Sequence, residues 1–115
     1  MNGIKIIDNK INLDSLREMA HQGFGDFVKV VVDIEQKIMA INGDMHSDEE
    51  ATLLKHGSKQ ENLWGINIYP DLQGENYIEF DSMINIRPRQ GNRSRNVEDF
   101  DIQRQIREAV ANLIG

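Results

Sequence analysis

The chain has 115 residues, a formal net charge of −6 and no cysteine. Its length predicts one domain over residues 1–115, and a domain of this size buries about two-thirds of the surface that the unfolded chain exposes. The lack of cysteine excludes disulfide bonds and thiolate metal sites and suits a reducing compartment. The negative charge disfavours generic binding to nucleic acid or membranes, but it is compatible with a local basic patch.

The chain carries no sign of a membrane protein or of a secreted one. No apolar run reaches the roughly 18 residues that a membrane span needs. The segment Met1-Asn2-Gly3-Ile4-Lys5 lacks the long apolar core of a signal peptide. We therefore expect a soluble cytoplasmic protein with no membrane partner.

The first part of the chain predicts a strand, a helix and a hairpin. Residues 4–7 form a short apolar run that is typical of a strand. Asn12 is a suitable N-cap for a helix whose apolar face consists of Leu13, Leu16, Met19 and Ala20. Residues 27–34 alternate as a strand does, and the apolar run at 38–41 follows after a short turn, so these two segments predict a hairpin.

A second helix is predicted from Ser47 to Gly57. Ser47 and Glu50 have the spacing of a capping box, in which each side chain accepts from the backbone amide of the other residue. Asp48 and Glu49 follow in the first turn, where the helix dipole favours negative charge. Gly57 suits the left-handed position that ends a helix.

The last part predicts a second hairpin and a final helix. Residues 63–69 alternate, with Trp64 on the apolar face, and residues 77–87 alternate as their return strand. Asp99 is a suitable N-cap for a helix that runs to the C-terminus. The order βα-ββ-α-ββ-α predicts the α+β class, as a single two-layer domain. In it, three helices cover one face of a four- or five-stranded, mainly antiparallel sheet.

The strongest indication of a binding site is a reversal of charge between Ser82 and Val97. This segment has no acidic residue and holds four of the seven arginines of the chain, namely Arg87, Arg89, Arg93 and Arg95. Guanidinium groups present a planar set of donors that fits phosphate or carboxylate bidentately, and Asn92 adds a small polar donor. We predict that this loop binds a phosphate-bearing ligand, a nucleic acid or a nucleotide, with Arg87 as the leading residue.

Two interpretations that involve no ligand compete with this prediction. The arginines have nearby acids as possible internal partners, namely Glu79, Asp81, Glu98, Asp99 and Asp101. Asn67 and Asn85 fall on the polar faces of the two predicted strands near Arg87, where they are candidate ligand-binding residues. The same row of polar residues is also typical of a solvated outer sheet face that has no function.

An enzymatic alternative centres on His46 and its neighbouring acids. A histidine beside Asp48, Glu49 and Glu50 suits acid–base chemistry or a divalent metal, and so indicates a small metal-assisted hydrolase or nuclease. The spacing matches no metal motif, and helix capping already accounts for two of the acids, so no metal ligand or cofactor is assigned. A third alternative is a protein-interaction module or homodimer, in which the arginines meet an acidic surface of a partner or a second copy.

Two segments of the chain also form a recognisable pair. The first contains His46-Ser47-Asp48-Glu49-Glu50, Leu53-Leu54, Gly57-Ser58, Gln60 and Leu63-Trp64-Gly65-Ile66-Asn67; the second contains Ile84-Asn85-Ile86-Arg87-Pro88, Gly91-Asn92-Arg93-Ser94 and Asp99. From about Phe27 to the C-terminus, the chain resembles a family of small prokaryotic proteins catalogued only as a domain of unknown function. The resemblance implies a bacterial or archaeal cytoplasmic protein, and it brings no activity, cofactor or catalytic residue with it.

Overall fold

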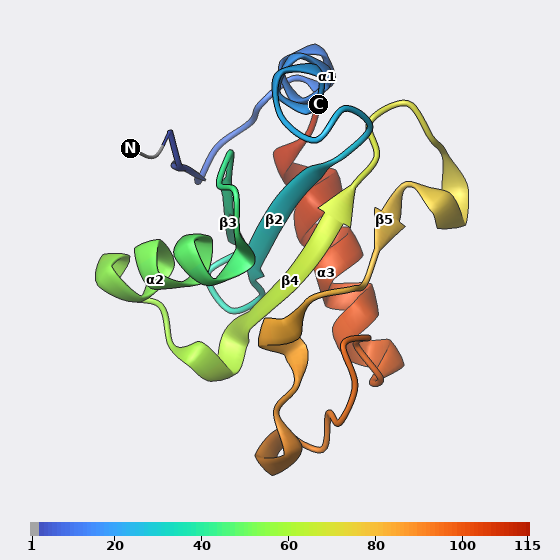
Figure 1. The fold of residues 1–115 in the computed structure, drawn as a ribbon. Helices are drawn as coiled ribbons and strands as arrows, with labels where there is room; N and C mark the ends of the chain where they lie inside the picture. The colour runs from blue at the N-terminus through green and yellow to red at the C-terminus, as the bar shows by residue number, and fades with distance from the viewer. Residues whose placement is uncertain (1–2) are drawn as a thin grey trace.

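A computed structural model describes residues 3–115, and it contains three α-helices and five strands (Figure 1). The helices are α1 (Leu13–Gln22), α2 (His46–His56) and α3 (Phe100–Leu113). The strands are β1 (Lys5–Ile7), β2 (Val28–Asp33), β3 (Ile38–Ile41), β4 (Leu63–Ile68) and β5 (Ile78–Glu79). Short 3₁₀ helices occupy Gln60–Asn62, Gly74–Asn76, Met83–Asn85 and Pro88–Gln90.

The five strands form one antiparallel sheet in the order β1-β3-β2-β4-β5. In the central register, Val30 lies opposite Ile41 on β3 and Ile66 on β4. Because side chains alternate between faces with a period of two, this register places the large apolar residues of three strands on the same face. The predicted α+β class, the antiparallel sheet and the three helices are confirmed.

The first face of the sheet packs against α1 and α3. Leu16 of α1 and Ile106 of α3 are fully buried against it, and Trp64 is 1% exposed, which confirms its predicted place in the core. The apolar core on this face includes Val28, Val30, Val32, Met39, Ile41, Ile66 and Ile68. Asn12 begins α1 and Asp99 begins α3, each by accepting from a backbone amide in the first turn, as predicted.

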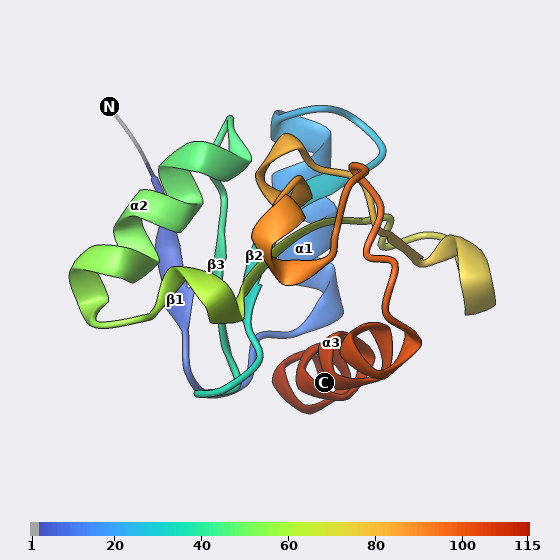
Figure 2. The same ribbon diagram turned by 90° about the horizontal axis from the view of Figure 1, so that it is seen from below.

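The second face of the sheet packs against α2, so the two-layer arrangement with helices on one face was wrong. Val31, Ile38 and Ala40 form a second, smaller core with Leu53 of α2 and Leu63. Figure 2 shows α2 and α3 on opposite sides of the strands. The physical reason is that β2, β3 and β4 carry apolar residues on both faces of the sheet, and strands of that kind need cover on both faces.

The predicted strand over residues 77–87 was also wrong beyond its first residues. Only Ile78–Glu79 pairs with β4, and the chain then turns into the 3₁₀ helix at Met83–Asn85. The Ser82 hydroxyl caps that helix by accepting from the Ile84 amide at 3.2 Å. A serine side chain that bonds the nearby backbone favours such a turn over a strand ladder.

The capping box predicted at Ser47 and Glu50 does not form. The helix α2 begins one residue earlier, at His46, and its N-cap is Met45, which has no side chain able to accept from the helix amides. The end of α2 is as predicted, because Gly57 adopts the left-handed conformation with φ of 113°. Within residues 3–115, no helix combines the length and the apolar character that crossing a bilayer requires.

Candidate functional site

The segment from Ser82 to Val97, called the arginine loop below, is fixed to the edge of β4 by an asparagine side chain. Asn85 accepts from the Gly65 amide at 2.8 Å and donates to the Gly65 carbonyl at 2.9 Å. It also donates to the Arg95 carbonyl at 2.9 Å, and it is fully buried. One side-chain amide therefore takes the hydrogen-bonding place of a strand residue beside β4, and Asn85 acts here as an anchor of the loop.

A second asparagine holds the loop closed. Asn92 is 3% exposed, and its amide nitrogen donates to three backbone carbonyls, those of Asn85 at 2.7 Å, Asn96 at 2.7 Å and Ser94 at 3.0 Å. Its side-chain oxygen accepts from the Glu98 amide at 2.8 Å. Backbone bonds between Arg87 and Asn92 close the turn through Gly91, whose φ of 78° is left-handed. Asn92 is thus committed to the loop itself.

The guanidinium of Arg87 is likewise used inside the protein. It donates to the carbonyls of Gln60 and Leu63 and to the Gln90 side chain. It also lies over the Trp64 ring, with Cζ 4.2 Å from the ring centroid. Burial lowers the pKa of Arg87. Arg87 is the residue predicted as the leading anion ligand. Its contacts instead connect the arginine loop to the start of β4.

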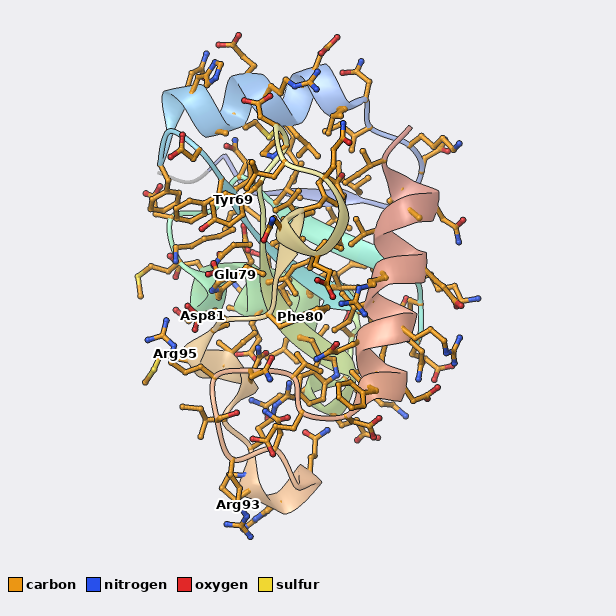
Figure 3. The ribbon with its side chains drawn as sticks, turned by 90° about the vertical axis from the view of Figure 1, so that its right-hand side faces the viewer. Tyr69, Glu79, Phe80, Asp81, Arg93 and Arg95 are labelled. Atoms are coloured by element: carbon orange, nitrogen blue, oxygen red, sulfur yellow. The ribbon has the colours of Figure 1, made fainter. Side chains whose placement is uncertain are left out.

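The remaining three arginines of the loop are exposed, and they differ in how they are paired. Arg95 forms an ion pair with Asp81 through Nε, 2.6 Å from the carboxylate oxygen. The guanidinium groups of Arg89 and Arg93 have no hydrogen bond or ion pair with any part of residues 3–115. Internal pairing with an acid, the competing interpretation, therefore describes Arg95 alone. Figure 3 shows Arg93 at the far end of the loop, where it projects from the body of the molecule.

Glu98 lies next to the far end of the arginine loop. The Glu98 carboxylate accepts from the Ser94 hydroxyl at 2.7 Å and from the Arg93 backbone amide at 3.0 Å. The Ser94 hydrogen bond, followed by that of the Arg93 amide, lowers the pKa of Glu98. The carboxylate thus stiffens the backbone of the loop and places one negative charge near Arg93.

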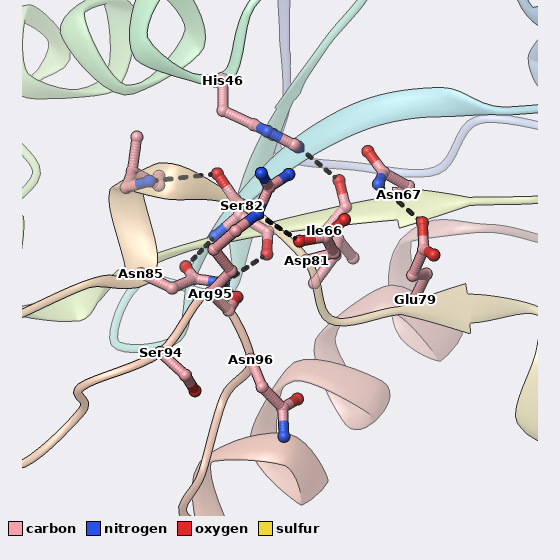
Figure 4. Close-up of polar contacts among 12 residues, drawn as sticks. His46, Ile66, Asn67, Glu79, Asp81, Ser82, Asn85, Ser94, Arg95 and Asn96 are labelled. Carbon is pink, nitrogen blue, oxygen red and sulfur yellow. Dashed lines mark hydrogen bonds and ion pairs between the residues drawn. The ribbon is translucent and has the colours of Figure 1, made fainter.

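A cavity of about 180 Å³ lies between the start of α2 and the arginine loop, and we call it the His46 cavity. His46 is 7% exposed, and its Nε2–H donates to the Ile66 carbonyl at 2.7 Å (Figure 4). Because a carbonyl can only accept, the proton lies on Nε2 and the lone pair on Nδ1. Burial lowers the pKa of His46 to about 4, so the ring is neutral at pH 7.

Two cationic side chains line the His46 cavity together with His46 itself. Lys29, on the second face of β2, has no ion pair within residues 3–115 and lies over the Phe24 ring, 5.2 Å from its centroid. Arg95 uses only Nε for Asp81, which leaves its two terminal nitrogens without a partner in residues 3–115. The alternation of β2 places Lys29 on the polar side of the sheet, but the sequence does not predict its proximity to Arg95, because that proximity arises from the sheet register and the loop path.

Asn67 lies on the second face of the sheet beside Lys29. It does not form, together with Asn85, the row of free ligand-binding amides that the sequence suggested. It is 5% exposed, and it donates to the Glu79 carboxylate at 2.9 Å. The Tyr69 hydroxyl donates to the same carboxylate oxygen at 3.2 Å. Asn85, in contrast, is turned onto the Gly65 backbone. The structure therefore does not bring the two asparagines together as a pair of free amides.

The acids near His46 are dispersed. Glu49 is fully buried and accepts from the Gly43 amide at 2.9 Å, and burial raises its pKa to about 9. Asp48 is exposed on the outer side of α2. Within residues 3–115, no three imidazole or carboxylate groups come together as a metal site would require. The described residues therefore provide no observation that supports the metal-assisted hydrolase or nuclease.

These features define a class of protein: an α+β fold with an antiparallel sheet that helices cover on both faces. A cavity lined by Lys29 and Arg95, and a loop that buried asparagines hold closed, lie beside the second face. The chain belongs to the family described as "Protein of unknown function (DUF5674)", whose model matches residues 5–113. The predicted resemblance to a domain of unknown function is confirmed. Comparison with curated proteins and with solved structures gave no match.

Proposed function

We propose that this protein is a non-enzymatic binding module for a phosphate-bearing ligand, a nucleic acid or a nucleotide, which it contacts through the arginine loop. The observation that carries the proposal is the contrast within the loop. The side chains of Asn85, Arg87 and Asn92 donate to backbone carbonyls of the protein. The guanidinium groups of Arg89 and Arg93, in contrast, are exposed to solvent. A loop fixed in this way loses little conformational entropy on binding.

The charge pattern supports an anionic ligand at this end of the molecule. The whole chain carries a charge of −6, yet residues 82–97 contain no acid. Guanidinium groups match phosphate oxygens with two parallel donors, and their interaction with a polyanion weakens with salt because counterions are released. Arg89, Arg93 and the free end of Arg95 are the residues that we assign to ligand contact.

The test is a fluorescence anisotropy titration of a short single-stranded RNA and its DNA equivalent at several salt concentrations. We expect Arg93→Gln and Arg89→Gln each to weaken binding several-fold at low salt and to reduce the salt slope by about 1. Arg104→Gln is the matched control, because Arg104 is an exposed arginine that pairs with Asp101 and Glu108 on α3. Equal affinities for all three variants would contradict the proposal.

A protein partner is the second candidate, and exposed apolar side chains favour it. Met83 is 65% exposed and Ile86 is 39% exposed, and both belong to the arginine loop. An acidic protein surface, or a second copy of this chain, would pair with the arginines and cover these side chains. Light scattering after size-exclusion chromatography distinguishes this candidate, because a homodimer would show a mass that rises with protein concentration and does not respond to oligonucleotide.

A further inference from the structure

The His46 cavity combines three features that no other region of the described chain brings together. Lys29 and Arg95 supply cationic donors, and the start of α2 supplies backbone amides. His46 supplies an acceptor, because Nδ1 has no hydrogen-bond partner within residues 3–115 and His46 is one of the residues that line the cavity. The side chain that carries this unused nitrogen is more than nine-tenths buried. A group inside the cavity is thus offered several donors and at least one acceptor.

The start of α2 lacks a side-chain cap. The N-cap, Met45, makes no side-chain hydrogen bond to the helix amides, and the amides of His46 and Ser47 donate to nothing within residues 3–115. The Ser47 hydroxyl is exposed and also has no partner in that range. A helix of this length places about half a positive charge at its first turn. Backbone donors, the dipole and two cations therefore act together on an anion.

We propose that the His46 cavity holds the terminal phosphate of a phosphate monoester, either a free nucleoside monophosphate or the phosphorylated end of a nucleic acid chain. This inference rests on the proposed function and names the chemical group that the site selects. The cavity volume of about 180 Å³ is smaller than the roughly 300 Å³ at which pockets for whole ligands begin, so it suits one terminal group.

The neutral acceptor distinguishes the protonated form of a monoester from a diester. The last proton of a phosphate monoester leaves with a pKa of about 6, so near neutral pH a part of the bound population keeps a P–OH group. That hydroxyl donates to Nδ1 of His46 while the other oxygens accept from Lys29, Arg95 and the helix amides. A phosphodiester has no such proton, and its oxygens would face the lone pair of Nδ1. The acceptor therefore favours a chain end over the chain interior.

The exposed residues that border the cavity suit a nucleoside that lies outside it. Asp44 lines the cavity and presents a carboxylate, which disfavours a bare anion but accepts from a ribose hydroxyl. Met45 and Met83 also line it and are 56% and 65% exposed. Thioether side chains adapt their shape and make favourable contacts with aromatic rings, so they offer a surface for a base. A nucleotide end satisfies the acidic, basic and apolar parts of the lining together.

The experiment compares one labelled single-stranded oligonucleotide in three forms: with a 5′-phosphate, with a 3′-phosphate and with hydroxyl groups at both ends. We expect one phosphorylated form to bind at least about tenfold more tightly than the hydroxyl form, which corresponds to about 1.4 kcal/mol. Lys29→Gln should abolish that preference and leave the hydroxyl form unaffected. Lys5→Gln, on the far edge strand β1, is the matched control and should retain the preference.

A second variant separates binding from folding. Ser47→Asp places a carboxylate in the first turn of α2, where the helix dipole favours it, so the melting temperature should stay the same or rise. The same charge lies at the cavity and should remove the preference for a terminal phosphate. A Ser47→Asp protein that keeps the preference would overturn the inference.

The outcomes also distinguish the two proposals and the two ligand sources. Equal binding of all three oligonucleotide forms would overturn the terminal-phosphate inference and leave the proposed function intact, whereas no binding of any oligonucleotide or nucleotide would overturn both. Competition by a nucleoside monophosphate as strong as that by the phosphorylated oligonucleotide would identify a free nucleotide as the ligand. Weak competition would identify a chain end. Arg93→Gln should weaken the phosphorylated and hydroxyl forms by the same factor.

Discussion

The two faces of the sheet differ in what they bury. The first face buries apolar side chains against α1 and α3, and it forms the larger core. The second face has a small apolar core under α2, and the buried polar residues gather on it or in the loops beside it, namely Asp33, His46, Glu49, Ser58, Asn67, Ser82, Asn85 and Asn92. A buried polar group contributes little net stability unless its partners are complete. The first face therefore supplies stability, and the second supplies a shaped and charged surface.

The largest expected effect comes from breaking the first face. Ile106→Ala removes a fully buried side chain of α3 and should lower the free energy of unfolding by about 3 kcal/mol, because it leaves a cavity in a packed core. Phe100→Ala on the same helix removes a side chain that is 82% exposed and should change stability by less than about 0.5 kcal/mol. Urea unfolding measures both. Equal losses would show that the first face is not the main source of stability.

A buried acid beside the second face should make the free energy of unfolding depend on pH. Glu49 has a pKa of about 9 in the folded protein against an ordinary value of 4.5. Above that ordinary value, the unfolded chain loses a proton that the folded chain keeps. Stability therefore falls as pH rises, by about 1.4 kcal/mol per unit or about 2.7 kcal/mol between about pH 6.5 and 8.5. Glu49→Gln should remove this slope in urea unfolding, whereas Asp48→Asn, exposed on the same helix, should retain it.

His46 has the opposite sign in a lower pH range. Its pKa falls from 6.5 to about 4 on folding, so its contribution is complete above about pH 6.5 and is lost as pH falls toward 4. Between about pH 4.5 and 6.5 the two contributions oppose each other, and we expect a plateau in stability with a decline above it. A stability that rises steadily from pH 6.5 to 8.5 would contradict the assignment to Glu49.

A smaller effect is expected from the loop that extends the second face. Asn92→Ala removes one amide that bonds four backbone groups and should cost about 2 kcal/mol. Asn92→Ala should also weaken oligonucleotide binding below the melting temperature, because the loop backbone that positions Arg89 and Arg93 is no longer held in place. Asn96→Ala, an exposed asparagine in the same loop, is the control and should do neither. Unchanged binding by Asn92→Ala would show that loop rigidity is not needed for binding.

The sequence by itself determined most of the secondary structure. Apolar alternation predicted β2 and β4, a short apolar run predicted β3, and the N-caps Asn12 and Asp99 marked the starts of two helices. These signals are local, since they depend on residues within one or two turns or on a period of two. The charge reversal that predicted the arginine loop is local for the same reason.

Only the tertiary structure decided which polar residues hold the fold and which stay open. Arg87 and Arg93 look alike in the sequence, but the Arg87 guanidinium meets the carbonyls of Gln60 and Leu63 across a long stretch of chain, whereas the Arg93 guanidinium pairs with no acid of residues 3–115. Asn85 leaves the predicted strand because the Gly65 backbone, 20 positions away, accepts and donates to its side chain. Contacts of this kind depend on sheet register and loop closure, which have no signature in the spacing of nearby residues.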